Sequence, residues 1–257
     1  MSNRETMSNL FLSIVTINFN NAEGLRETIE SIRSQNFDNY EHIIIDGGSS
    51  DGSVDIIKEF LKDPSYARHL SFWCSEKDGG RYNAMNKGIM RSKGQYVATL
   101  NSGDCYAVDA LSGLEEIAAK NPDAVLYGAI SVYLNGVFKG ATCSPAYLLP
   151  QLMIPHPASF VPLNLYNKYG LYDETFKSSG DWELFLRMYK SGAVFVYLDK
   201  IISHYDLGGI SSTNIQLVEK ENARLLKRWG EYRVSYKQRL FRMVRAVYKL
   251  LRKVFCL

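Results

Sequence analysis

The chain has 257 residues, 46% of them hydrophobic, which is enough to bury the core of one α/β domain, or of one domain plus an appendage. No apolar run approaches the roughly 20 residues of a membrane-spanning helix, which excludes such a span. The formal charge of +3 is unevenly distributed: residues 224–257 carry eleven Lys and Arg and one Glu, a net +10, whereas residues 1–223 carry a net −7. The N-terminal segment has neither a basic start nor a small-residue cleavage site, so we expect no signal peptide.

The four cysteines, Cys74, Cys105, Cys143 and Cys256, are scattered and show no Cys-x-x-Cys spacing. We expect free thiols, with disulfides as the alternative. A reducing compartment, the cytoplasm, is the expected location.

The first hundred residues alternate apolar, β-branched runs with helical patterns. We expect strands within 10–19, 40–48, 69–80 and 94–100, and helices within 20–35, 49–61 and 81–93. This alternation indicates a mostly parallel sheet of right-handed βαβ units. Ligands of such sheets bind beyond the carboxyl ends of the strands. Three polar, acid-bearing loops fall at that edge: IDGGSSDG, SEKDGGRYN and TLNSGD.

The second half of the chain is less regular. We expect helices at 110–120 and 178–192, a strand pair at 124–134 and 136–141, and a strand at 193–205. Five prolines between Pro145 and Pro162 favour irregular chain there.

The basic end of the chain reads as an amphipathic helix. RLFRMVRAVYKLLRKVF, residues 239–255, places apolar residues at i, i+3 and i+4 on one face and Lys and Arg on the other. This pattern favours an anionic membrane surface over a helix docked on the body. We expect no nucleic-acid partner, because no aromatic platform or RNA-binding motif accompanies the charge.

Several common site motifs are absent from the sequence. It has no GxxxxGK[ST] phosphate loop, no GxGxxG dinucleotide motif and no GxSxG nucleophile elbow. The remaining candidate is an acid-lined sheet edge, suited to the ribose and base of a nucleotide and to a hard cation.

Five segments, SIVTINFN, IIIDGGSSDGS, SEKDGGRYNAMNKGI, GQYVATLNSGD and GDWELFLR, resemble in order and spacing the inverting glycosyltransferases of family 2. The resemblance covers residues 13–212. It implies a GT-A fold, with a Rossmann-like central sheet flanked by helices, over residues 8–215. The nucleotide-sugar half would span 8–105, the acceptor half 106–215, and the basic helical tail 216–257. The family also implies a nucleotide-sugar donor, usually a UDP-sugar, and a Mn²⁺ or Mg²⁺ ion.

The resemblance assigns roles to four residues of the first loops. Asp46 matches the carboxylate that binds uracil, with a turn or helix cap as the alternative. Asp51 is a helix cap or a ligand. Asp78 resembles the second acid that contacts the nucleotide. Arg81 would face the diphosphate, with a surface ion pair as the alternative.

Asp104 matches the family carboxylate that binds the ion between the two phosphates, and a turn residue is the alternative. Gly103 departs from the family, because many relatives have a first acid there. The ribose contact would then fall to Asn101 or to a backbone group. His204 is a candidate to complete the metal shell, or is structural.

Asp181, at the start of a helix, matches the catalytic base of the family. The helix N-terminus favours the ionised form that a base requires, and a plain N-cap is the alternative. Gly180 stands where relatives often have an acid. Glu183 is a weaker alternative base.

Two further positions resemble the acceptor side of the family site. His156, in the proline-rich segment, would line it, and Trp182 would stack on a sugar. Tyr82 is a stacking residue or, like Trp182, a core aromatic. Arg228 and Trp229 are similar to the end of the QxxRW motif of processive relatives. Leu225 replaces the Gln of that motif and no membrane span follows, so we expect one sugar per encounter.

The function expected from this resemblance is inverting transfer of one hexose, glucose or galactose in β-linkage, from a UDP-sugar to a polyprenyl-diphosphate-linked sugar. The setting would be O-antigen, lipopolysaccharide or other surface polysaccharide biosynthesis, on the cytoplasmic face of the inner membrane. Two alternatives are a non-catalytic nucleotide-sugar-binding scaffold and a nucleotidyltransferase of the same fold. The latter would need a GxGxRxxP start, which SIVTINFN does not supply.

Overall fold

The computed structural model describes residues 10–134, 136–206 and 214–229. Strands and helices alternate in the first part as expected: β1 (Leu12–Asn18), α1 (Ala22–Arg33), β2 (Tyr40–Asp46), α2 (Ser53–Phe60), α3 (Pro64–Ala67), β3 (Leu70–Ser75), α4 (Arg81–Ile89) and β4 (Tyr96–Thr99). These strands lie in the order β3-β2-β1-β4 and pair in parallel. Every residue of β2 is buried, as in parallel strands that helices cover on both faces.

The second part completes the sheet with mixed pairing. Its elements are β5 (Cys105–Tyr106), α5 (Leu114–Lys120), β6 (Val125–Leu134), β7 (Val137–Thr142), the 3-10 turns η1 (Ala146–Leu148) and η2 (His156–Ala158), β8 (Ser159–Pro162), α6 (Leu163–Tyr169), α7 (Gly180–Lys190), β9 (Phe195–Asp206) and α9 (Ile215–Arg228). The order continues β4-β8-β6-β9-β5, with β7 on β6. β6 and β9 are parallel, and the other pairs of this part are antiparallel.

The expected α/β fold is confirmed, but the prediction of irregular chain from Pro145 to Pro162 is wrong at its end. Residues 159–162 form β8, a buried strand between β4 and β6. Four residues are too few to show a strand period, and the surrounding prolines hid the strand. Pro162 is the last residue of β8 and lies beyond the pairs that β8 makes with β6.

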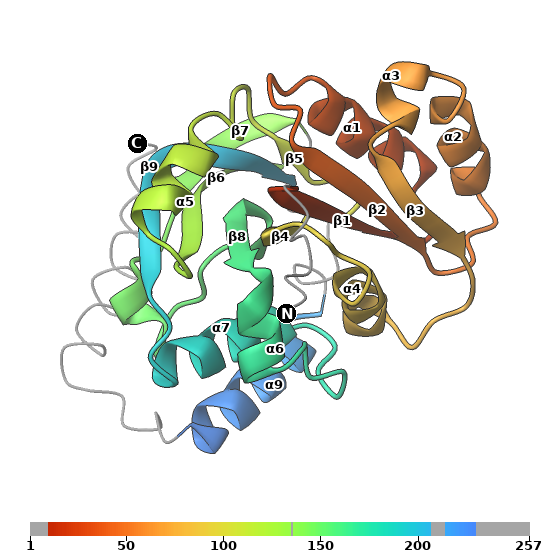
Figure 1. Ribbon diagram of the computed structural model, residues 1–257. Helices are drawn as coiled ribbons and strands as arrows, with labels where there is room; N and C mark the ends of the chain where they lie inside the picture. The colour runs from red at the N-terminus through yellow and green to blue at the C-terminus, as the bar shows by residue number, and fades with distance from the viewer. Residues whose placement is uncertain (1–9, 135, 207–213, 230–257) are drawn as a thin grey trace, which may run out of the picture.

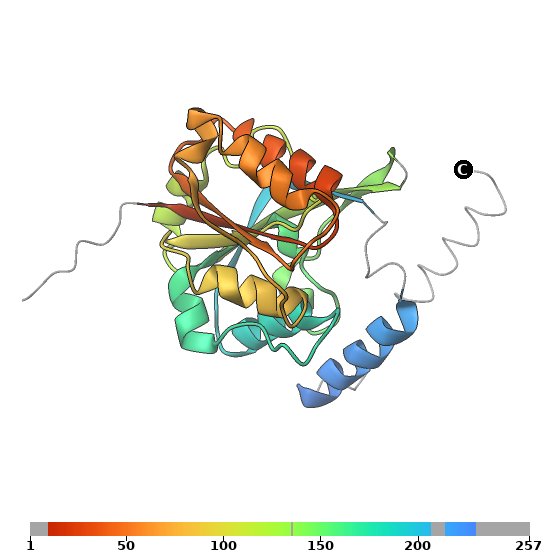
Figure 2. The ribbon, with the colours of Figure 1, turned by 90° about the vertical axis from the view of Figure 1, so that its right-hand side faces the viewer.

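Helices cover both faces of the sheet (Figure 1, Figure 2). Ile44 of β2 packs in one cluster with residues of α1 and α2. Its neighbours Ile43 and Ile45 pack in another cluster with residues of α4 and α7. Because successive strand residues point to opposite faces, the continuous apolar run of β2 serves both layers.

Helix α9 belongs to the packed body of the described residues. Leu225 is fully buried in the cluster that contains residues of α4 and α7, and Glu221 is buried as well. The first part of the expected 216–257 tail therefore packs on the preceding residues. The amphipathic segment 239–255 lies outside the described residues, and its membrane role stays a prediction.

Cys74, Cys105 and Cys143 are free, as expected, and Cys256 lies outside the described part of the chain. None of the helices within the described ranges combines the length and hydropathy needed to cross a bilayer. The fold thus positions the loops of the carboxyl edge without a membrane span among these residues.

Candidate active site

Asp46 ends β2 and is fully buried. Its Oδ1 accepts hydrogen bonds from Asn18 Nδ2 (2.7 Å) and Ser49 Oγ (2.5 Å). Its Oδ2 accepts from Ser75 Oγ (2.5 Å) and from the backbone N–H groups of Ser49 (2.9 Å) and Gly48 (3.2 Å). Burial raises the pKa of Asp46, but these bonds outweigh it and the pKa lies below its ordinary value. The contacts match the turn alternative, and the uracil contact stays a prediction.

Asp51 lies exposed in the same loop. Its Oδ1 accepts from the backbone N–H (3.1 Å) and hydroxyl (2.6 Å) of Ser53, and its Oδ2 from the N–H of Ala22 (2.8 Å). The hydroxyl bond is the main reason why the pKa of Asp51 is lowered. Asp51 thus binds the first N–H groups of α1 and α2, while the N-cap residues themselves are Asn21 and Gly52.

Asp78 and Arg81 stand at the start of α4. Asp78 Oδ2 lies 3.1 Å from where a Cβ on Gly47 would be, so this carboxylate faces the loop that follows Asp46. Arg81 is the first residue of α4; burial acts to raise the pKa of both Asp104 and Asp181, and the charge of Arg81 opposes this effect. Among the described residues, no hydrogen bond or ion pair engages its guanidinium, so the surface ion pair is not seen there.

Asp104 follows β4 and is 7% exposed. Burial raises its pKa to about 6, against the lowering effects of the His156 and Arg81 charges and of hydrogen bonds from Asn101. No cation within the described ranges lies at ion-pair distance from this carboxylate. Asp104 is therefore a buried acid whose charge is only partly compensated.

The glycine before Asp104 has a backbone reason. Gly103 has φ +96°, which side chains other than glycine rarely adopt. Its N–H donates to Thr28 Oγ1 (2.9 Å), and Thr28 Oγ1 in turn donates to the carbonyl of Asp104 (2.9 Å). The tight turn thus explains why no acid stands at position 103.

His204 lies in β9, opposite Cys105 in the β5–β9 ladder, so its backbone runs beside Asp104. Its Nδ1 lies 2.5 Å from Ser131 Oγ, and its ring packs edge-on against Tyr133. Burial lowers the pKa of His204, which favours the neutral form of the ring. Its metal role stays a prediction.

The residues around Asp104 offer a sparse set of metal ligands. No group of three or more His, Cys, Asp or Glu that could hold a metal occurs in the described part of the chain. Mg²⁺ and similar hard ions bind through one or two carboxylates plus substrate phosphates and water. The single buried carboxylate of Asp104 fits an ion bound in that way.

Asp181 is the second residue of α7 and is 6% exposed. Its Oδ2 lies 3.1 Å from His156 Nδ1, and its Oδ1 accepts from Trp182 N (3.0 Å) and from the Tyr82 hydroxyl (3.3 Å). His156 Nε2 lies 3.1 Å from Asn101 Nδ2. Because an ionised carboxylate only accepts hydrogen bonds, His156 Nδ1 is the donor in this contact. Burial raises the pKa of Asp181, but the His156 contacts and the Trp182 N–H bring it below its ordinary value.

Tyr82 of α4 meets the start of α7. Its hydroxyl accepts from the backbone N–H groups of Gly180 (2.8 Å) and Asp181 (3.4 Å). A Cβ on Gly180 would lie 2.7 Å from the Tyr82 ring, so this ring requires glycine there. Tyr82 is 2% exposed, as the core alternative expects. Sequence reasoning missed its bonds to Asp181, since residues 99 apart leave no local signal.

The neighbours of Asp181 on α7 have core contacts. Trp182 is 8% exposed, and its indole N–H donates to the carbonyl of Leu149 (2.7 Å), in line with the core alternative. Glu183 is fully buried and pairs with Arg187 (2.9 Å). Asp181 is therefore the carboxylate of this helix that meets His156.

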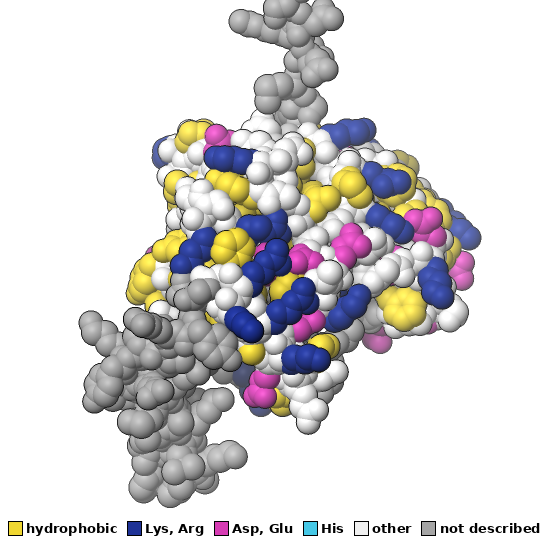
Figure 3. Space-filling model, turned by 90° about the horizontal axis from the view of Figure 1, so that it is seen from below, with side chains coloured by type: hydrophobic (Ala, Val, Ile, Leu, Met, Phe, Trp, Pro, Cys, Tyr) yellow, Lys and Arg dark blue, Asp and Glu magenta, His cyan; other side chains and the backbone are white. Residues whose placement is uncertain are grey.

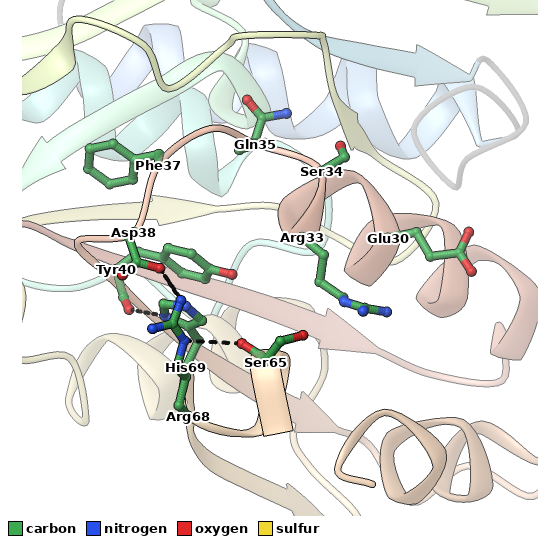
Figure 4. Close-up of a pocket in the computed structure, with 10 residues that line it drawn as sticks. All are labelled: Glu30, Arg33, Ser34, Gln35, Phe37, Asp38, Tyr40, Ser65, Arg68 and His69. Carbon is green, nitrogen blue, oxygen red and sulfur yellow. Dashed lines mark hydrogen bonds and ion pairs between the residues drawn. The ribbon is translucent and has the colours of Figure 1, made fainter. Parts of the chain in front are cut away.

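A cavity of about 490 Å³ lies at the opposite edge of the sheet, at the amino ends of β2 and β3 (Figure 4). Tyr40 stacks on His69 there, with ring centroids 4.1 Å apart. Arg68 pairs with Asp38 and Arg33 with Asp63, and His69 Nε2 lies 3.1 Å from Asp38 Oδ1. The cavity therefore offers no unpaired cation, and it is separate from the acid-lined edge.

Comparisons with known sequences identify relatives of this chain. Residues 13–180 match the family Glycosyl transferase family 2. An uncharacterized glycosyltransferase of Mycobacterium tuberculosis is 36% identical over 189 residues, which cover 68% of each chain. A PGL/p-HBAD biosynthesis glycosyltransferase of Mycobacterium bovis is 28% identical over 213 residues, 81% of each chain.

Solved structures share the fold. S. aureus TarS superposes with a TM-score of 0.64 at 16% identity over 84% of this chain and 39% of its own. Its 1–349 fragment in complex with UDP-GlcNAc has a TM-score of 0.61 at 17% identity, over 76% of this chain and 58% of that one. The mannosyltransferase PcManGT from Pyrobaculum calidifontis, in complex with GDP-Man and Mn²⁺, gives 0.63 at 13% identity, over 84% and 62%. At these identities the likeness establishes the GT-A fold.

Proposed function

Since the chain belongs to glycosyl transferase family 2, we propose that it transfers one hexose from a UDP-sugar to a polyprenyl-diphosphate-linked sugar with inversion. The observation that carries the proposal is the pairing of His156 with Asp181 (3.1 Å), close enough to Asp104 and Arg81 that charge effects connect all four residues. The UDP-sugar is supported by the TarS structures, whose complexes hold UDP and UDP-GlcNAc. A donor with an α-linked sugar, such as UDP-glucose or UDP-galactose, would give a β-linkage.

Asp181 is the proposed base. An ionised Oδ atom takes the proton of the acceptor hydroxyl as its oxygen attacks the anomeric carbon from the face opposite the diphosphate. The new C–O bond forms as the bond to the diphosphate breaks, and the leaving diphosphate keeps the electron pair. His156 and Tyr82 hold the carboxylate in place, and its lowered pKa keeps it ionised at neutral pH.

Arg81 and Asp104 are proposed to serve the leaving group. Arg81 brings a positive charge that no carboxylate of the described residues neutralises at ion-pair distance. Asp104, with His204 as a candidate second ligand, would hold Mn²⁺ or Mg²⁺. A bound ion would supply Lewis-acid stabilisation of the charge on the departing diphosphate. Asp46, Asp78 and Asn101 are proposed to contact the nucleotide.

The proposed setting is surface polysaccharide assembly, such as O-antigen, on the cytoplasmic face of the inner membrane. The basic amphipathic pattern of residues 239–255 supports contact with anionic lipid, where the lipid-borne acceptor resides. The relative named for PGL/p-HBAD biosynthesis supports a biosynthetic role.

The test is turnover of a panel of sugar nucleotides with Mn²⁺ and a polyprenyl-diphosphate sugar, for wild type and Asp181→Asn. We expect release of UDP from UDP-glucose or UDP-galactose, and a fall in kcat of about 10²–10⁴-fold in the variant. Full activity of Asp181→Asn would refute the base. Absence of turnover with every donor would favour the non-catalytic scaffold.

A further inference from the structure

The helix that carries Asp181 lacks a cap of its own. Its N-cap residue, Ser179, makes no side-chain bond to the helix backbone. The Ser179 hydroxyl instead donates to Asn222 Oδ1 of α9 (2.7 Å). The first N–H groups of a helix have no partner inside it, so a buried helix start requires acceptors from elsewhere.

Glu221 of α9 supplies these acceptors to the segment just before α7. Its Oε1 accepts from the backbone N–H of Lys177 (2.7 Å). Its Oε2 accepts from the N–H groups of Ser178 (2.8 Å) and Ser179 (2.9 Å). The residue is 6% exposed, and no cation of the described residues lies within ion-pair distance of it. The three N–H groups therefore compensate its buried charge, through charge-assisted bonds.

The N–H groups that follow bond to other side chains. Those of Gly180 and Asp181 donate to the Tyr82 hydroxyl, and that of Trp182 donates to Asp181 Oδ1. The backbone from 177 to 182 is thus held by Glu221, Tyr82 and Asp181 itself. A shift of the first three residues would move Asp181 relative to its partners.

Other contacts also hold α9 against the segment before α7. Arg224 donates to Thr175 Oγ1 (2.7 Å) and lies 4.6 Å from the centre of the Phe176 ring. Arg228 pairs with Asp173 (2.8 Å). On the lower face of the molecule, basic and acidic side chains lie next to one another (Figure 3). Helix α9 is therefore fixed at several points.

We propose that Glu221 is a positioning residue for the transfer reaction: by holding the backbone of residues 177–179, it sets the orientation of Asp181 toward His156. The inference rests on the proposed function, in which Asp181 is the base. Glu221 contacts the backbone rather than Asp181, so it acts through the start of α7. The domain then requires α9 for turnover as well as for packing.

The pKa of Asp181 depends on how its carboxylate is oriented, because that orientation sets its contacts with His156 and Trp182. Asp181 contacts His156, which lies in η2, and Tyr82, which lies in α4. The charge of Arg81, also in α4, acts on the pKa of Asp181. Burial and the charge of Asp181 in turn raise the pKa of Tyr172. Burial raises the pKa of Asp181, and the contacts with His156 and the N–H of Trp182 lower it. Loss of the contact geometry would raise the pKa toward the value that burial favours.

The experiment is the pH profile of kcat for the full chain, for wild type, Glu221→Gln and the control Glu219→Gln, an exposed change on the same helix. The glutamine amide has only one oxygen to accept hydrogen bonds. Its NH₂ group would then lie against a backbone N–H of residues 177–179, where neither group can accept. We expect Glu221→Gln to lower kcat about tenfold, the effect of one unpaired buried group. The acidic limb should move to higher pH, and the donor KM should stay unchanged. Glu219→Gln should match wild type.

A Glu221→Gln profile that superimposes on that of wild type would overturn the proposal. So would a profile with a lower kcat and an unmoved acidic limb, because a loss of folded enzyme lowers the amplitude without moving the limb. Should this variant fail to fold, Glu221→Asp replaces it, which keeps the charge but shortens the reach, with the same expected shift. A wild-type protein without turnover would refute the proposed function. An active wild type with an unmoved variant profile would refute the role of Glu221 alone.

Discussion

The loops after β2 and β4, which flank β1 in the sheet, both carry a buried aspartate but treat it in opposite ways. Asp46 receives five hydrogen bonds from its surroundings, and its pKa lies below the ordinary value. Asp104 has a pKa raised to about 6. Burial is common to both, so the number of donors makes the difference. The carboxylate of Asp46 is stabilised by hydrogen bonds from the protein, whereas the charge of the Asp104 carboxylate is left for a cation to compensate.

The largest expected effect is on turnover, when each of these two aspartates is replaced by asparagine. Asp104→Asn removes the carboxylate proposed to hold the ion, and we expect kcat to fall about 10³-fold, in keeping with the several kcal/mol of a metal's charge stabilisation. Asp46→Asn should keep Mn²⁺ dependence and raise the donor KM instead. Titration of turnover against Mn²⁺ for both variants checks this. Wild-type turnover and Mn²⁺ dependence in Asp104→Asn would contradict the assignment.

The variants Asp104→Asn and Asp46→Asn should also change the free energy of unfolding in opposite directions. Because Asp104 has a pKa of about 6 in the folded state against 3.8 ordinarily, the folded state binds the extra proton, and the free energy of unfolding falls as pH rises from about 4 to about 6. Asp104→Asn removes this loss and should stabilise the protein at pH 7.5 by up to about 3 kcal/mol.

Asp46 has a lowered pKa, so the stability it contributes is present above its ordinary pKa and is lost as pH falls through its folded-state pKa. Asp46→Asn should destabilise at pH 7.5 by about 1–3 kcal/mol. Urea unfolding without divalent metal, at pH 4 and 7.5, measures both variants. A destabilised Asp104→Asn at pH 7.5 would show that its loop needs the carboxylate.

The smallest expected effect concerns Asp51, whose bonds hold two helix starts. Asp51→Ala should cost about 1 kcal/mol of unfolding free energy, as loss of a helix cap does, and leave kcat unchanged. Urea unfolding together with turnover checks both, with the exposed Lys58→Ala in α2 as control. A large fall in kcat would make Asp51 a ligand rather than a cap.

Sequence patterns located the loops of the parallel half because each follows a strand whose apolar run is easily recognised. Asp46, Asp78 and Asp104 fall at one edge for that reason alone. The pairing of His156 with Asp181 could not be predicted, because it depends on the short strand β8 and on chain segments 25 residues apart. Nor does a sequence show how many donors surround a carboxylate.

Glu221 was assigned to the tail, yet the sequence carried a local signal. It lies three residues after Val218 and four before Leu225, so it stands on the apolar stripe of α9. A charged residue in such a stripe is buried only with partners, and these come from residues 177–179. The stripe could have marked Glu221, but only the fold identifies what it holds.

The contact between Tyr82 and Gly180 also limits how this site can change over evolution. With the ring 2.7 Å from a Cβ at position 180, that position accepts a side chain only if residue 82 becomes smaller or its ring moves. An acidic side chain at 180 would therefore clash with the tyrosine at 82 as this chain places it. A second acid at the start of α7 would thus require a change at position 82 or a displacement of its ring.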